Sequence, residues 1–432
     1  MPSLGGPGRR AAIIAGVRTP FARAGTALKD LTAIELGKRC VSELLQRTNL
    51  DGREVEAIIY GTVVPAVTAP NIAREVSLMP MLPKSCDAYS VSRACASANQ
   101  AITNAVDQIV LGHHDVVIAG GAESLSNVPV LHSRAMASKL VAMSRAKSAM
   151  AKARIAGSVR PRDLVPITPA IAEPSTGETM GQSAEKMAKI NHIPREEQDQ
   201  FALRSHRLAA AGTAEGTLTA EIAPTYLPPR YATVLASDNG IRTDTSIDQL
   251  RALKPVFDRR YGTVTAGNSS PLTDGGSAVL LMSESRARSL GYRPLAFVRS
   301  YAYAALDPGE QLLMAPVLAA PVALERAGLG LGEMDLVEMH EAFAAQVLCN
   351  LAGFTSHAWA ERAGFAEPVG EVDRARLNVM GGSIAIGHPF GATGGRILTT
   401  LANELVRRGG QFGLMTVCAA GGLGHAMVIE SA

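Results

Sequence analysis

The chain has 432 residues, of which 47% are hydrophobic and 19% charged, and its formal net charge is +3. This composition excludes an intrinsically disordered chain, and the length allows a large core in about two or three domains. The small net charge gives no global reason to expect a nucleic-acid partner, although a local basic stretch can still bind an anionic ligand.

The cysteines and the N-terminus indicate a soluble, cytoplasmic protein. The chain contains an odd number of cysteines without a Cys-x-x-Cys or a paired Cys/His spacing, which argues against a disulfide framework and a structural zinc site. A polar start, MPSLGGPGRR, passes directly into the apolar run from residue 11, so we expect neither a signal peptide nor a transit peptide. No apolar run is long enough to span a membrane.

Glycine-bounded apolar runs alternate with helical patterns along the chain. The runs are AAIIAGV (11–17), EAIIYGTVV (56–64), DVVIAGG (115–121), SAVLLMS (277–283) and GLMTVCAAGG (413–422). Alternating strands and helices predict an α/β protein whose sheet carries helices on its faces.

The segment VSRACASANQAI (91–102) places Cys95 where an apolar run gives way to a helical pattern. Apolar residues recur at spacings of three and four from Ala98 to Val110, so a helix is expected to begin just after the cysteine. The backbone N–H groups at a helix N-terminus favour a thiolate, and the small neighbours let a bulky substrate approach. Cys95 is therefore either a nucleophile or a packed core cysteine.

Two segments suggest an internal duplication. Residues 106–124 and 403–422 each run from a helix end through a glycine turn and an apolar strand to Gly-Gly. Any helix-turn-strand unit produces this pattern. The two segments are therefore either a true repeat or two unrelated units of the same kind.

The middle of the chain has a different character. From Arg134 to Arg162 there are eight Lys or Arg and no Asp or Glu, and proline-rich and helical stretches follow. We therefore expect an N-terminal half (1–133 and 262–292), an inserted loop domain (134–261) and a C-terminal half (293–432).

Three further candidates lie in the C-terminal half. Six glycines between residues 381 and 395 surround His388, without a phosphate-binding P-loop or dinucleotide fingerprint. His388 is either a base aimed at a cleft or a turn residue without a role. Cys418 ends an apolar strand, which is both a common ligand position and a common core position. His340 and Glu341 stand at a strand-to-helix junction, and their spacing does not predict a metal site.

Four ordered motifs make the chain resemble the thiolase family over essentially its whole length. They are ACAS around Cys95, HEAFA from His340, GHP around His388 and CAAGG from Cys418. AGNSSPLTDG and AGGAES match further signatures of that family. The resemblance implies two similar βαβαβαββ halves that form a five-layered αβαβα core, plus an inserted loop domain.

Two departures place the chain within the family. Most thiolases have asparagine where His340 stands, and Cys-Gly-Ser-Gly where this chain has Cys-Ala-Ser-Ala. Both features, with Asn99-Gln100, GTVVPAV and NSSPLTDG, resemble the thiolase (beta) subunit of the fatty-acid oxidation trifunctional complex and its bacterial relatives.

The resemblance implies a 3-ketoacyl-CoA thiolase that cleaves its substrate with CoA through an acyl-Cys95 intermediate. His388 then acts as general base, and Cys418 protonates the acetyl-CoA carbanion. One oxyanion hole is expected from backbone N–H groups near Cys95 and Ala420, and another from His388 with a water held by residue 340. An imidazole at 340 titrates near neutral pH, so we expect His340→Asn to alter the pH profile while acylation stays detectable.

CoA and acyl-CoA are expected as substrates, with no permanently bound cofactor and no metal. Ser270 aligns with a serine of the family that contacts pantetheine. Residues 134–162 are expected to bind CoA phosphates, an anionic membrane or a partner subunit, or to form a solvated helix. The resemblance also implies a homodimer or tetramer, with a hydratase/dehydrogenase subunit as a candidate partner.

Other functions compete with this interpretation. The nearest is an acetyl-CoA C-acetyltransferase that uses the same residues to condense acetyl-CoA. A non-catalytic thiolase-like binding protein is the alternative from another class, although such a protein would be expected to lose the nucleophile or the base. A ketoacyl synthase is less consistent with the arrangement of the histidines.

Overall fold

The glycine-bounded apolar runs of the N-terminal part form one side of a mixed sheet. The structure is a computed structural model that describes residues 4–167 and 172–432. The strands are β1 (Ala11–Arg18), β3 (Ala57–Gly61), β4 (Asp87–Val91), β5 (Val116–Glu123) and β8 (Thr273–Ser283). Their spatial order is β4-β3-β5-β8-β1, in which β3 is parallel to β4 and β5, and β8 is antiparallel to β5 and β1. The short strand β2 (Ala22–Arg23) also pairs with β8.

The C-terminal part repeats this arrangement. The strands are β9 (Ala296–Ala305), β10 (Leu336–Met339), β11 (Phe412–Ala419) and β12 (Leu423–Ser431). They lie in the order β10-β11-β12-β9, and an isolated parallel bridge between Val337 and Leu377 takes the place that β4 has in the first half. An antiparallel pairing of β1 with β9 joins the two parts. The segments 106–124 and 403–422 fall at equivalent places, so the internal duplication is confirmed.

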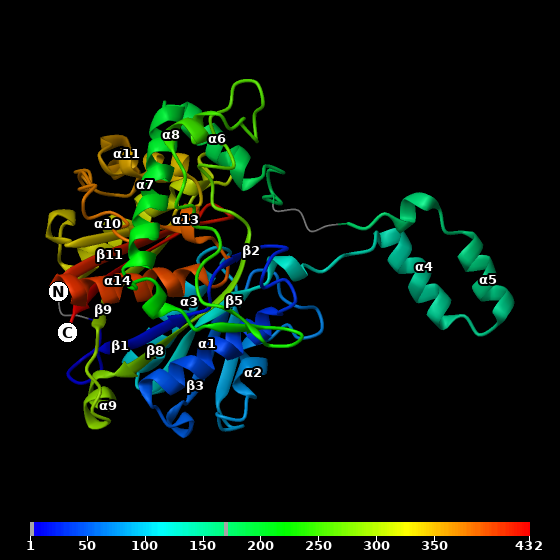
Figure 1. Ribbon diagram of the computed structural model, residues 1–432, viewed down its shortest axis with the longest axis horizontal. Coiled ribbons are helices and arrows are strands. Elements are labelled where there is room, and N and C mark those ends of the chain that lie inside the picture. The colour runs from blue at the N-terminus through cyan, green and yellow to red at the C-terminus, as the bar shows by residue number, and fades with distance from the viewer. Residues whose placement is uncertain (1–3, 168–171) are drawn as a thin grey trace.

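Three helix layers cover and separate the sheet halves (Figure 1). The layers contain α1 (Ala33–Thr48) with α2 (Ile72–Ser77), α3 (Ser97–Val110) with α14 (Thr393–Arg408), and α10 (Ala315–Ala327) with α11 (Ala344–Phe354). Because neighbouring residues of a strand face opposite sides, Ala12 packs toward α1, whereas Ile13 packs toward α3 and α14. In the same way, Leu414 packs toward α10 and Met415 packs toward α14. The expected five-layered core is confirmed.

The chain between β5 and β8 supplies the remaining helices of this region. They are α4 (Arg134–Arg145), α5 (Ala149–Gly157), α6 (Met180–Ile190), α7 (Arg195–Ala214) and α8 (Ile247–Arg251), with a ribbon of β6 (Thr225–Leu227) and β7 (Thr233–Leu235). Figure 1 shows α4 and α5 as a hairpin that projects away from the rest of the molecule, and neither helix contains a buried residue. Shorter helices elsewhere are α9 (Glu284–Ser289), α12 (His357–Arg362) and α13 (Ser383–Ile386).

None of the helices within residues 4–167 and 172–432 has both the length and the apolarity that a membrane crossing requires.

The two halves meet through backbone groups that leave no room for a side chain. A Cβ at Gly121 of β5 would lie 1.9 Å from the carbonyl oxygen of Gly391 and 2.5 Å from that of Gly61. A Cβ at Gly394, in the first turn of α14, would lie 2.1 Å from Oδ1 of Asn99 on α3. Glycine is thus required where the loop before α14 rests on the ends of β3 and β5.

We expect Gly121→Ala to lower the free energy of unfolding by about 3 kcal/mol, because backbone rather than a flexible side chain must move. Thermal unfolding measures this loss. Gly332→Ala is the matched control, since a Cβ there has nothing within 4 Å. Equal melting temperatures for the two variants would contradict the expectation.

Candidate active site

Cys95 lies in a sharp turn between β4 and the first turn of α3. Ala94 has a φ of +44°, a left-handed conformation that L-residues with a side chain adopt at an energetic cost. The turn is held by Ser97, whose hydroxyl donates to the Ala94 carbonyl over 2.6 Å and accepts from the Arg93 N–H over 2.8 Å. The predicted helix start just after Cys95 is confirmed, and Cys95 as a whole residue is half-buried.

His388 occupies the equivalent place in the second half, a few residues before α14. Its N–H donates to the hydroxyl of Thr273 over 3.1 Å, and Leu272 and His388 form a parallel bridge. Its imidazole Nδ1 lies 2.7 Å from the hydroxyl oxygen of Thr393, the first residue of α14. The orientation of the His388 ring is therefore fixed by two contacts, one through its backbone N–H and one through its Nδ1.

His340 follows β10 directly, and its N–H donates to the Thr416 carbonyl of β11 over 2.9 Å. Its Nδ1 lies 3.0 Å from the Ser383 hydroxyl, and its ring centroid is 4.1 Å from that of His388. One nitrogen of each imidazole and the Cys95 sulfur lie within 4.8 Å of one another. Three residues that are far apart in the sequence thus converge.

The second cysteine and its neighbour complete this cluster. Cys418 is buried in β11, close enough to Cys95 for that thiol to help raise the pKa of Cys418. The N–H groups of Ala420 and of Cys95 itself point at the Cys95 sulfur. These two donors are the pair that sequence comparison proposed for an oxyanion hole.

Burial governs the protonation of the site. It raises the pKa of Cys95 to about 12, although the N–H groups of Ala420 and Cys95 pull that pKa down. Burial also raises the pKa of Cys418 well above its usual value, and the nearby Cys95 adds to this shift. Both cysteines are therefore thiols at neutral pH, so Cys95 needs a base before it can attack.

The imidazoles shift in the opposite direction, because desolvation disfavours their charged form. Burial and the Arg396 charge lower the pKa of His388 to about 3. The pKa of His340 is lowered well below its usual value by burial, by His388 and by Arg396. Both rings are neutral at pH 7. The expectation that His340 titrates near neutral pH is therefore wrong, since it ignored burial.

The hydrogen-bond network assigns opposite tautomers to the two histidines. The Thr393 hydroxyl donates its proton to the Pro389 carbonyl over 3.1 Å, so it accepts from His388 Nδ1–H and leaves Nε2 of His388 with a lone pair. The Ser383 oxygen accepts from Arg396 over 3.0 Å and has His340 Nδ1 as acceptor for its own proton, so Nε2 of His340 carries hydrogen.

Neither Nε2 atom has a hydrogen-bond partner among the described residues, and the two side chains are 3% and 1% exposed. His388 thus presents a base to the Cys95 thiol, and His340 presents a hydrogen-bond donor to the same space. A nucleophile, its base and a donor for developing negative charge are together what acyl transfer requires.

Comparison with known proteins agrees with this chemistry. Residues 11–285 match the thiolase N-terminal domain, and residues 292–431 match the thiolase C-terminal domain. The 3-ketoacyl-CoA thiolase of Pectobacterium atrosepticum is 52% identical over 431 residues, which cover 100% of this chain and 98% of that relative. The chain belongs to the thiolase family.

Solved structures of thiolases have the same fold. The acetyl-CoA acetyltransferase of Bacillus anthracis matches with a TM-score of 0.85 and 32% identity, covering 100% of both chains. Human mitochondrial 3-ketoacyl-CoA thiolase in complex with CoA matches with a TM-score of 0.82 and 32% identity, covering 100% of this chain and 99% of that chain. The predicted thiolase resemblance is confirmed, and the chain is an acyltransferase of a family that uses CoA substrates.

Two buried carboxylates hold this thiolase site together, and sequence reasoning assigned a role to neither. Glu123 accepts from the N–H groups of Val63, Val64 and Gly391 over 2.9 to 3.0 Å, which ties the ends of β3 and β5 to the His388 loop. The AGGAES motif contained Glu123, but the pattern gave no sign of its partners.

Glu341 plays the corresponding part behind His340. It accepts from the Ser205 hydroxyl of α7 and from Nδ2 of Asn378, each over 2.7 Å. Asn378 also exchanges hydrogen bonds with the backbone of Met339, the last residue of β10. The HEAFA motif therefore supplies an anchor as well as the histidine.

Ser270 lies outside the cluster, on the wall of a cavity of about 220 Å³. Arg23 and Arg242 line the same cavity, which gives it a cationic side suited to phosphate. The Ser270 N–H donates to the Ala342 carbonyl over 2.9 Å, so the AGNSS segment lies against the HEAFA segment. No residue of 134–162 lines this cavity.

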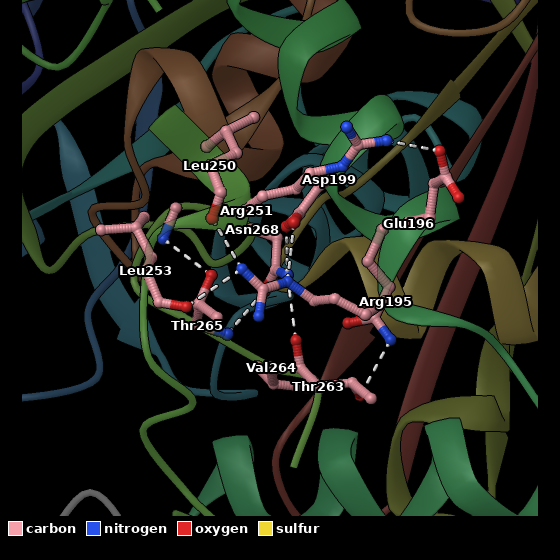
Figure 2. Close-up of polar contacts among 12 residues, drawn as sticks. Arg195, Glu196, Asp199, Leu250, Arg251, Leu253, Thr263, Val264, Thr265 and Asn268 are labelled. Carbon is pink, nitrogen blue, oxygen red and sulfur yellow. Dashed lines mark hydrogen bonds and ion pairs between the residues drawn. The ribbon is translucent and has the colours of Figure 1, made fainter. Parts of the chain in front are cut away.

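A polar network positions the segment that carries Ser270 (Figure 2). Asp199 of α7 accepts from Arg195 over 2.7 Å and from Nδ2 of Asn268 over 2.9 Å. Arg195 also donates to the carbonyls of Leu250, in α8, and of Leu253, just after it. The inserted helices therefore set the position of one wall of the cavity.

We expect Thr393→Val to slow acylation of Cys95 by about 100-fold, because loss of the Nδ1 acceptor frees His388 to adopt the other tautomer. Rapid-quench measurement of the acyl-enzyme tests this. Thr393→Ser keeps the hydroxyl and is expected to restore most of the rate. Equal acylation by the Val variant and the parent enzyme would contradict the tautomer assignment.

Proposed function

We propose that this thiolase is a 3-ketoacyl-CoA thiolase (acetyl-CoA C-acyltransferase) of fatty-acid β-oxidation. The observation that carries the proposal is the convergence of the Cys95 sulfur with one nitrogen of each of the two imidazoles. The 3-ketoacyl-CoA thiolases that are about half identical along the full chain support the choice of substrate.

The first half-reaction begins with transfer of the Cys95 thiol proton to Nε2 of His388. The sulfur forms a bond to the C3 carbonyl carbon, and negative charge develops on that oxygen next to the N–H of His340. The C2–C3 bond then breaks. Its electron pair stays on C2, which takes the proton of Cys418 and leaves as acetyl-CoA, while the acyl group remains on Cys95.

The second half-reaction returns the enzyme to its starting state. The CoA thiol gives its proton to the Cys418 thiolate and attacks the acyl-Cys95 thioester. The N–H groups of Ala420 and Cys95 are directed at the sulfur and are suited to stabilise the oxyanion of this step. Cys95 leaves as a thiolate and recovers its proton from His388, and a shortened acyl-CoA is released.

Two measurements test this function. Mass spectrometry after incubation with a 3-ketoacyl-CoA is expected to show an acyl adduct on Cys95 that is absent from Cys95→Ala. Thiolysis rates over a series of chain lengths are expected to extend beyond the four-carbon substrate. Cys349→Ala is the control, since that buried cysteine lies in α11 outside the cluster.

The same measurements decide between the alternatives. The match to an acetyl-CoA acetyltransferase structure supports a second candidate, a condensing acetoacetyl-CoA thiolase. Activity confined to the four-carbon substrate would favour that enzyme. A protein without any adduct on Cys95 would instead be a non-catalytic thiolase-like binding protein.

We further propose that the protein is cytoplasmic and works as a homodimer or tetramer, with a hydratase/dehydrogenase subunit as a candidate partner. Strand β4 supports self-association. Within residues 4–167 and 172–432 it pairs only with β3, and its residues are at least partly exposed, unlike those of β5 and β8. An unpaired strand edge favours pairing with another chain.

The α4–α5 hairpin supports a peripheral contact with an anionic membrane rather than with CoA. It carries only basic charges, and Leu140, Val141 and Met150 are 39%, 48% and 82% exposed. Exposed apolar side chains beside basic ones are typical of segments that lie at the surface of a bilayer. The projection of the hairpin away from the thiolase core leaves it free to do so (Figure 1).

We expect the protein to bind vesicles that contain phosphatidylglycerol and not vesicles of phosphatidylcholine alone. Reversal of Lys147, Lys152 and Arg154 to Glu is expected to weaken binding by at least about 100-fold, since each basic residue near the surface contributes about 1 kcal/mol and each added carboxylate is repelled. The control reverses the same number of exposed basic residues on the core. These are Lys29, Lys254 and Arg293. An equal loss in both variants would contradict a specific role of the hairpin.

A further inference from the structure

Three side chains of the types that bind transition metals meet at the bottom of the candidate active site. They are Cys95, His340 and His388, and their ligand atoms lie within 4.8 Å of one another. Both Nδ1 atoms are engaged by hydroxyl groups, so the nitrogens left for a ligand are the two Nε2 atoms. These atoms are buried and have no partner among the described residues.

We propose that Cys95, His340 and His388 form a binding site for one borderline-soft divalent cation, above all Zn²⁺, which competes with the acyl group for the Cys95 sulfur. Binding of the cation does not depend on the proposed activity. Only its consequence, reversible inhibition, rests on the proposed thiolase function.

The ligand set fits the coordination chemistry of zinc. Zinc binds thiolate sulfur at about 2.3 Å and imidazole nitrogen at about 2.0 Å, and sites with three protein ligands keep an open fourth position. Tetrahedral ligands at these bond lengths are about 3.3 to 3.5 Å apart, so a spacing of 4.8 Å must contract by about 1.3 Å. Cys95 can provide this movement by rotation of its side chain, because it is partly exposed between two alanines.

The hydroxyl groups that contact Nδ1 of the two histidines are also compatible with a bound metal. A histidine that binds a metal commonly donates its second N–H to an oxygen, and His388 already donates to Thr393. His340 needs the other tautomer, in which its proton sits on Nδ1 and the Ser383 hydroxyl accepts it. This exchange moves a proton within the ring, so one proton is released per metal bound, from the Cys95 thiol.

The composition of the cluster sets its selectivity. It contains soft and borderline ligands, whereas Mg²⁺ and Ca²⁺ require oxygen ligands. The nearby carboxylates of Glu123 and Glu341 are both occupied by hydrogen bonds from the protein. His340 is the decisive residue, because it supplies the second of the two imidazole ligands, and imidazole suits zinc.

Direct binding to the full-length, reduced protein tests the site, with Zn²⁺ as the probe in competition with a chromophoric chelator. We expect one Zn²⁺ per chain at this site and no response to an equal concentration of Mg²⁺. Cys95→Ala and His340→Asn are each expected to weaken binding by at least 100-fold. His113→Asn, at an exposed histidine remote from the cluster, is expected to leave it unchanged.

Chemical modification of Cys95 in the folded wild-type protein tests the same site without relying on variants that could misfold. Wild-type protein whose Cys95 has been alkylated by iodoacetamide is expected to lose the site, and bound Zn²⁺ is expected to slow that alkylation in turn. Absence of stoichiometric Zn²⁺ binding would overturn the proposal. Full affinity in either the Cys95 or the His340 variant would also overturn it, because the three-residue site requires both.

Inhibition is a separate readout. Zn²⁺ is expected to inhibit thiolysis at concentrations that match its binding constant, and a chelator is expected to restore the rate. If the protein binds Zn²⁺ but has no thiolase activity, the proposed metal site still holds and only the proposed function is refuted. Thiolysis unaffected by saturating Zn²⁺ would overturn the proposed competition for Cys95.

Discussion

The close approach of two backbone segments is the constraint on which the site depends. The loop that carries His388 rests on the ends of β3 and β5, where Gly121, Gly61 and Gly391 leave no space for a Cβ. Glu123 closes the same contact by accepting hydrogen bonds from both sides. This packing brings the start of α14 beside the start of α3, and thus the base of one half beside the thiol of the other.

Burial at this junction then determines the chemistry. It keeps Cys95 and Cys418 protonated and both imidazoles neutral, as their shifted pKa values show. Neutral imidazoles differ from each other only through the position of one proton, and Thr393 and Ser383 set that position in opposite ways. Two chemically identical rings thereby become a base and a donor.

The same arrangement is the basis of the proposed competition between a metal ion and substrate for Cys95. A thiol and two imidazole nitrogens without protein partners are poised for an acyl group, and they are equally the ligands that zinc prefers. The spacing of the residues along the chain gave no sign of such a site, because the three ligands come from separate segments of both halves.

The sequence by itself determined the strands, the helix that follows Cys95 and the order of the four motifs, because strand and helix periodicity and residue chemistry are local properties. It also determined the thiolase resemblance, which implied two similar halves. Only the tertiary structure decided the pKa values, the tautomers and the roles of Glu123 and Glu341, because these depend on burial and on partners far along the chain. The tertiary structure also decided where the basic segment 134–162 lies. Its helices form a projecting hairpin, and none of its residues lines the cavity that holds Ser270.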